Sequence, residues 1–294
     1  MPVLSFVMQC ARLLPIFLLT AAAPAAANLR APFFVDGKFG AHIDAEHAHP
    51  ALELVRESFE ASLPMFSVGD APPAHARLIV LYDIVNSSSA PITLTVRFLA
   101  LGARDVRIEV NQRLVEHHEV VDRAEWAAAA DIIAAARCKG VEGCEPARVR
   151  QALDHWLERD QGSFDSIAFD AVFAPGRSTI RVAYAQALTI HEGSYGYFMR
   201  GTFGTRGARY GFDYLLFPAT TWKIADDFRF DVQVEVPDTM DRGWLSTSFV
   251  PPETIQSTLP LTQTRAPHPS TTLRAQLAGF PVEVFTLTVT VPRG

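Results

Sequence analysis

Most of the chain after residue 76 consists of short stretches in which apolar and polar side chains alternate. A period of two puts the apolar groups on one face of an extended strand, the pattern of a half-buried β-strand. Six runs are clear: 77–85, 92–101, 106–110, 179–184, 228–236 and 282–291. Polar residues 86–91 separate the first two, so we predict that these two runs form a β-hairpin.

Residues 52–59 alternate less regularly, and a helix is the alternative to a strand there. As a strand, one face would carry Leu52, Leu54, Arg56 and Ser58, and the other Glu53, Val55, Glu57 and Phe59. Residues 251–270 hold five prolines among Ser, Thr and Gln, so we predict a long surface loop before the final strands.

Residues 122–160 have the spacing of helices. Asp122 and Glu125 form a capping box, and a first helix to about residue 137 follows. Pro146 stands at the first position of a second helix, whose apolar stripe is Val149, Leu153, Trp156 and Leu157. We therefore predict a helical hairpin inserted between strands, with Trp126 and Trp156 packed on the sheet or, alternatively, facing a partner.

A glycine- and aromatic-rich stretch spans residues 193–214. Glycine at this density indicates sharp turns, and aromatic rings on turns bind sugars or peptides. The predicted binding residues are Tyr195, Tyr197, Phe203, Arg200 and Arg206, the arginines supplying forks for anions. Tyr210, Phe212, Tyr214 and Leu216 are predicted instead to be the inward face of a strand.

The first 27 residues have the layout of a secretory signal peptide. Arg12 precedes an apolar run from Leu13 to Leu19, and small residues lead to an A-x-A site at Ala25–Ala27. The apolar run is too short for a convincing membrane span. We expect cleavage after Ala27, an uncleaved anchor being the alternative, no transmembrane segment in the mature chain, and a periplasmic or secreted location.

Composition narrows the classes of partner. The 294 residues are 49% hydrophobic and 20% charged, as in a globular protein, and the net charge is -6. A negative chain with no polybasic run has little attraction for phosphate backbones, so nucleic-acid binding is disfavoured.

Two cysteines remain in the expected mature chain, Cys138 and Cys144. An even pair in an oxidising compartment predicts a disulfide, here closing a short local turn. A redox pair or a two-thiolate metal site is the alternative, but the spacing is wrong for both.

Three histidines, His42, His47 and His49, lie close together near the expected mature N-terminus. Imidazoles at this spacing suit zinc or copper, although chance clustering on a solvated segment explains them equally simply. We expect no cofactor, with zinc or copper at these histidines as the alternative.

Catalytic motifs are weak. The chain has no G-x-S-x-G elbow, and its Gly201, Gly204 and Gly207 do not have dinucleotide-binding spacing. Whether the protein is an enzyme stays open, with no catalytic residue assigned and a non-catalytic role favoured.

The order of three segments, 52–63, 76–86 with its following strand, and 214–236, resembles an uncharacterised family of exported bacterial β-rich proteins. Tyr82 and Asn86 match the family's Y-x-x-x-N turn, and Tyr214, Leu216, Trp222 and Phe228 its later piece. The resemblance implies a periplasmic or secreted β protein and supplies no catalytic residue.

Together these patterns predict a signal peptide (1–27), a first β half (28–121), a helical hairpin (122–160) and a second β half (161–294). The fold class is mainly β, an antiparallel β-sandwich, one large or two abutting, with the hairpin inserted. The expected function is non-catalytic binding of a protein, glycan or cell-envelope component through loops. The alternative is an envelope metal-binding protein or hydrolase that uses His42, His47 and His49.

Overall fold

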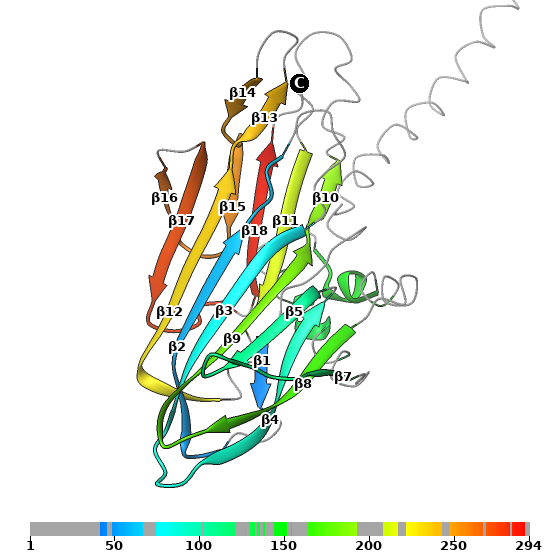
Figure 1. Ribbon diagram of the computed structural model, residues 1–294. Coiled ribbons are helices and arrows are strands. Elements are labelled where there is room, and N and C mark those ends of the chain that lie inside the picture. Colours follow the sequence, from blue (N-terminus) through cyan, green and yellow to red (C-terminus); the bar gives the residue numbers. More distant parts are fainter. Residues whose placement is uncertain are drawn as a thin grey trace, which may run out of the picture.

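The structure is a computed structural model that describes most of the chain beyond residue 41. The described residues are 42–45, 49–66, 75–101, 103–120, 144–151, 154, 164–192, 208–216, 222–242, 247–266, 269–282 and 284–291, with single residues of 127–138. They are mainly β, in one large sheet and three smaller ones (Figure 1).

The largest sheet has eight strands. In sheet order they are β16 (Thr262–Arg265), β17 (Ser270–Leu277), β12 (Lys223–Pro237), β2 (Leu52–Ser62), β3 (His75–Asn86), β9 (Gly176–Ala187), β5 (Ala103–Val110) and β6 (Arg113–Leu114). Strands β12 and β2 run parallel, whereas the other neighbours are antiparallel. The sheet is therefore mixed, and the prediction of a purely antiparallel sheet is wrong. The parallel pair forms where β2, from the first half of the chain, lies beside β12, from the second half.

Two four-stranded sheets and a two-stranded ribbon complete the β structure. The first is β1 (His42–Ala45), β4 (Ile92–Leu101), β8 (Phe164–Phe173) and β7 (His118–Val120). The second is β10 (Thr189–Glu192), β11 (Ala208–Leu215), β18 (Val284–Val291) and β15 (Thr254–Ser257). The ribbon is β13 (Thr239–Arg242) with β14 (Thr247–Val250).

Both four-stranded sheets pack on one face of the large sheet, called the inner face below. Phe59 of β2 lies opposite Val80, and Tyr184 of β9 lies opposite Leu78, two residues along β3 from Val80. Residues two apart on a strand share a face, so Phe59 and Tyr184 point the same way. The Phe59 ring meets Tyr214 of β11 at 4.4 Å between centroids.

The ring of Tyr184 contacts Phe98 of β4 at 5.4 Å. The hydrophobic core therefore lies between the large sheet and the two smaller ones, which follow one another along its length (Figure 1).

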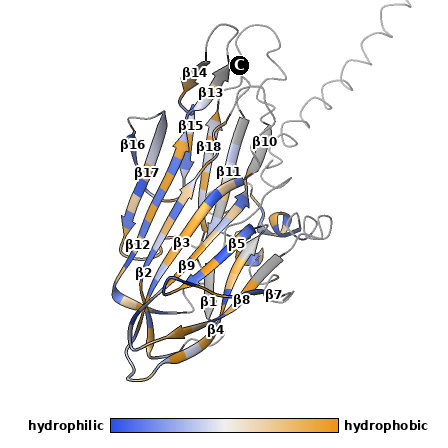
Figure 2. Ribbon diagram, viewed as in Figure 1, coloured by the Kyte–Doolittle hydropathy of each residue, from blue (hydrophilic) through white to orange (hydrophobic). Residues whose placement is uncertain are grey.

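The period of two in the sequence is the period of burial. In β12, Phe228, Phe230, Val232, Val234 and Val236 are buried while the residues between them are half-buried or exposed. Figure 2 shows the same alternation of hydrophobic and hydrophilic residues along β12 and β17. Burying an aliphatic or aromatic side chain contributes roughly 1.5–3 kcal/mol, which is why the pattern predicts the strands.

Strand β2 confirms the predicted strand but not the predicted assignment of its faces. Residues 52–62 are a strand, not a helix, but a β-bulge between Leu54 and Arg56 shifts the alternation by one residue. Leu52, Leu54, Glu57 and Phe59 consequently share the inner face. The predicted division into two faces is wrong beyond the bulge, and a glutamate enters the core.

The predicted hairpin of residues 77–85 and 92–101 is also wrong. Strand β3 pairs with β2 and β9 in the large sheet, while β4 pairs with β1 and β8 in a small one. The polar turn between them carries the chain from one layer to the other. Buried Asn86 stabilises this turn by donating through Nδ2 to the carbonyl oxygens of Ala90 and Phe173, both at 2.9 Å.

Helix is found in two short stretches of the described residues, within 127–138 and within 146–154. A disulfide joins Cys138 to Cys144 between them, as predicted. The Arg150 Nη1 atom donates to the carbonyl oxygen of Ala127 at 2.9 Å and pairs with the Asp131 carboxylate. No helix among the described residues has the length and apolar character that crossing a bilayer requires.

Candidate binding slot between two sheet edges

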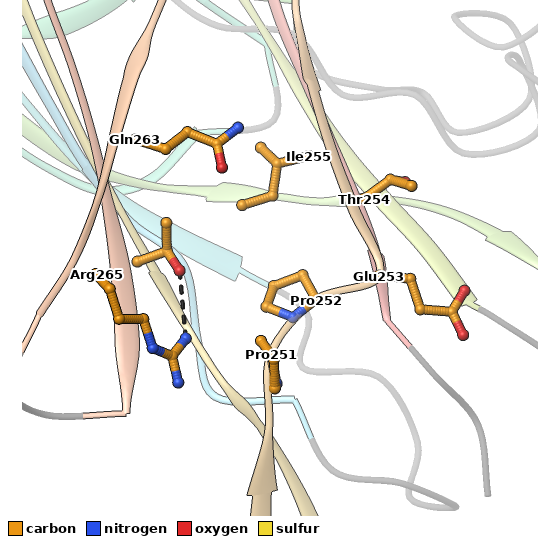
Figure 3. A pocket seen from close by; sticks show the side chains of 8 residues that line it. Pro251, Pro252, Glu253, Thr254, Ile255, Gln263 and Arg265 are labelled. Atoms are coloured by element: carbon orange, nitrogen blue, oxygen red, sulfur yellow. Dashed lines mark hydrogen bonds between the residues drawn. The ribbon is translucent and has the colours of Figure 1, made fainter.

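An open pocket of about 460 Å³ lies where one edge of the large sheet meets one edge of a small sheet. We call it the edge slot, and its lining residues are Pro251, Pro252, Glu253, Thr254, Ile255, Gln263, Arg265 and Thr271. Among the described strands, β16 ends the large sheet and β15 ends the small one. The slot thus lies between β16 of the large sheet and, on the small sheet, β15 with the residues just before it (Figure 3).

One wall of the edge slot comes from β16 and β17. Gln263 lies opposite Leu273 and Arg265 opposite Thr271, and both β17 residues are buried. Directly opposite residues share a face, so Gln263 and Arg265 point to the inner face while Thr264, between them, points to the other. All four residues of β16 are exposed.

The other wall comes from β15 and the residues just before it. Ile255 lies opposite the buried Val289, so its side chain points toward the large sheet. In Figure 3 Ile255 and Pro252 face Gln263 across the slot, while the Glu253 carboxylate points away from its middle. The walls therefore offer apolar and amide surface, with a carboxylate at the rim.

Arg265 is held by a buried carboxylate. Asp238 is fully buried and accepts hydrogen bonds from both terminal nitrogens of Arg265, that from Nη1 to Oδ1 being 2.5 Å long. These hydrogen bonds raise the pKa of Arg265 above its ordinary value. The two hydrogen bonds fix the orientation of the guanidinium at the wall of the slot. The positive charge of Arg265 is neutralised there by the negative charge of Asp238.

A second polar cluster lies in the core, away from the slot. Tyr214 of β11 donates to Oε1 of Glu57 at 2.7 Å, and its hydroxyl lies 3.0 Å from that of Tyr82. All three residues are buried. Burial, followed by the charge of Glu57, raises the pKa of Tyr214 well above its ordinary value. The cluster joins the large sheet to a small one, since a buried carboxylate needs donors from the facing layer.

The residues predicted to bind from the glycine- and aromatic-rich stretch lie outside the described residues: Tyr195, Tyr197, Arg200, Phe203 and Arg206. Their binding role stays a prediction. Its neighbouring strand behaves as expected, since the side chains of Tyr210, Phe212, Tyr214 and Leu216 are all buried.

The predicted metal ligands are only partly described. His42 begins β1, His47 lies outside the described residues, and Nδ1 of His49 accepts a hydrogen bond from the backbone N–H of Ala51 at 3.2 Å. Within the described ranges, no group of three or more His, Cys, Asp or Glu side chains gathers as a metal site. The zinc or copper hypothesis stays a prediction.

Sequence reasoning missed the edge slot because it read residues 251–270 as one loop. The segment contains β15 and β16 and ends at the start of β17. Both short strands are mostly polar, as edge strands facing water are, so no apolar alternation marked them. The Thr and Gln residues of 254–264, which tolerate strand conformation, were the available signal.

No family model matches the chain, and no curated protein matches it. The resemblance to an uncharacterised exported family thus has no matching family model behind it. Among solved structures, similarity is found to a Legionella pneumophila protein described as a "putative nutrient binding protein". It is 9% identical, with a TM-score of 0.49, over 86% of this chain and 72% of that one.

The M1 zinc metallopeptidase of Deinococcus radiodurans is also similar, at 12% identity and a TM-score of 0.38. The match covers 84% of this chain but 43% of the metallopeptidase. At such identities and TM-scores, neither similarity assigns an activity to this chain.

Proposed function

We propose that this protein is an exported, non-catalytic β module that binds a protein, glycan or other cell-envelope component at the edge slot. The observation that carries the proposal is an open pocket with walls from the edges of two different sheets. Binding sites combine apolar surface with a few polar groups, which the lining of Ile255, two prolines, Gln263 and Arg265 provides.

The lining residues support binding better than chemistry. Arg265 is committed to Asp238, and the Glu253 carboxylate is at the exposed rim. A hydrolytic site needs a nucleophile beside a base that a third group orients. The described lining residues offer apolar and amide surface instead.

Export rests on the signal peptide expected at residues 1–27, and the mature protein is placed in the periplasm or outside the cell. The disulfide supports an oxidising compartment. The fold we propose is a β-sandwich whose layers meet at the core described above. An inserted helical hairpin at residues 122–160 is part of this proposal, and the disulfide and the Arg150 contact with Ala127 support it.

Two matched tryptophan variants test the site. Gln263→Trp fills the edge slot from an exposed position, whereas Thr264→Trp places the same ring on the opposite face of the same strand. We expect Gln263→Trp to abolish capture of the native envelope ligand by the immobilised protein, with Thr264→Trp capturing as wild type does. Both variants should melt within a few degrees of wild type. Equal capture by the two variants would place the binding site elsewhere.

A further inference from the structure

The hydrogen-bond phase of β16 fixes which of its backbone groups face outward. Ala266 N–H donates to the carbonyl oxygen of Ser270 at 3.1 Å, just beyond the paired residues Arg265 and Thr271. In an antiparallel ladder, hydrogen-bonded and non-hydrogen-bonded pairs alternate. Thr264 is therefore bonded to β17, while the N–H and C=O groups of Gln263 and Arg265 point away from it, at the edge that no other described strand pairs with.

Gln263 and Arg265 thus have both features that a sheet edge needs in order to bind an additional strand. Their backbone groups point outward in the plane of the sheet, and their side chains line the edge slot on its inner face. A strand placed beside β16 would send every second side chain into the slot, because side chains of paired strands on one face lie side by side.

We propose that the ligand of the edge slot is an extended polypeptide segment, which adds to β16 as a ninth strand of the large sheet. This rests on the proposed function and names its partner. Main-chain hydrogen bonds to Gln263 and Arg265 supply affinity, and the slot selects the alternate side chains, as in β-strand addition generally.

The slot also sets the chemistry of those side chains. Arg265 and Asp238 cancel each other, and the Glu253 carboxylate points away from the middle of the slot, so an inserted acid or base finds no countercharge inside it. The facing wall is Ile255 with Pro252. Uncharged, apolar side chains at alternate positions of the peptide are therefore the complementary ones, and binding depends weakly on salt.

A second copy of this chain fits the edge less well. Edge-to-edge pairing through β16 would bring only Gln263 and Arg265 of the second copy to the slot, and its Arg265 is already bound to its own Asp238. Two four-residue strands also bury far less surface than the roughly 1,200 Å² or more of a stable dimer.

The first experiment selects binders from a random 12-residue peptide display library on the full exported protein. Each nitrogen of the tightest peptide is then methylated in turn, and affinity is measured by fluorescence polarisation. Strand addition predicts losses of at least tenfold at every second position and changes under threefold between them. Losses without this period, or no enriched peptide, would overturn the proposal.

The second experiment removes one donor of the protein. Gln263→Pro deletes an N–H that does not bond to β17, a position where an edge strand tolerates proline. Gln263→Ala keeps the N–H but removes the side chain that lines the edge slot, so it measures the share of the side chain alone. We expect Gln263→Pro to bind the peptide at least tenfold more weakly than Gln263→Ala does, with both variants melting near wild type.

The outcomes separate the two proposals. Binding that is lost in Gln263→Trp but kept in Gln263→Pro would refute strand addition and leave the edge slot as the binding site. Binding unaffected by either variant would refute both. Concentration-dependent dimers in sedimentation that Gln263→Pro abolishes would identify a second copy as the occupant and overturn the peptide proposal.

Discussion

Replacing Arg265 with alanine should destabilise the protein through the carboxylate that it leaves behind. The side chain of Asp238 is fully buried, while that of Arg265 is 49% exposed. Removing one partner of a buried ion pair costs about 3–5 kcal/mol, because the remaining charge is uncompensated. Water can enter from the exposed side of Arg265, so we expect the lower value of about 2–3 kcal/mol.

A loss of that size is measurable by urea unfolding and by melting temperature. For a chain of this length, roughly 2–4 °C per kcal/mol gives a decrease in melting temperature of about 4–12 °C. Thr264→Ala, on the opposite face of the same strand, is the control and should change stability by about 0.5 kcal/mol or less. Arg265→Lys keeps the charge but loses the bidentate geometry, so its effect should be intermediate.

A double-mutant cycle tests the cause. Asp238→Asn removes the buried charge, so Arg265→Ala should cost at least about 1 kcal/mol less in that background. Additive effects, or an Arg265→Ala loss below about 1 kcal/mol, would show that the pair behaves as an ordinary surface salt bridge and would contradict a stabilising role for its burial.

Two further predictions concern Tyr214 and the disulfide. Because the pKa of Tyr214 is raised in the folded protein, its contribution is complete below about pH 10 and is lost as pH rises above that value. Between pH 9 and 11, wild type should therefore lose about 1.4 kcal/mol more free energy of urea unfolding than Tyr214→Phe, most of it above pH 10; equal losses would contradict this assignment. Thiol titration of the unreduced, unfolded mature protein should find no free thiol, and two would exclude the Cys138–Cys144 bond. The double Cys→Ser variant should lose about 2 kcal/mol, since the bond closes a short loop.

Sequence reasoning succeeded where a residue's neighbours along the chain determine its environment. The buried faces of β12 and of Tyr210, Phe212 and Tyr214 follow from alternation, because one face of each strand is packed. The disulfide followed from an even cysteine pair at short separation.

Sequence reasoning failed where residues distant in the sequence determine the structure. Residues 86–91 look the same whether the chain turns back into a hairpin or crosses between layers. The crossing between layers is stabilised by a hydrogen bond from Asn86 to the carbonyl oxygen of Phe173, which is 87 residues away in the sequence. The bulge in β2 likewise brings Glu57 into the core, where Tyr214 of another sheet supplies its donor.

Alternation along the chain is enough to predict a β protein with one packed face per strand, because burial with a period of two is a local property. Which strands are neighbours, and which edges no other described strand covers, depends on the folded arrangement. The edge slot exists because β15 and β16 end two different sheets. Its Arg265 side chain is held in place by Asp238, which lies between β12 and β13. Such pairings depend on contacts between segments that are distant in the sequence. The free energy of those contacts cannot be inferred from a local pattern of side chains.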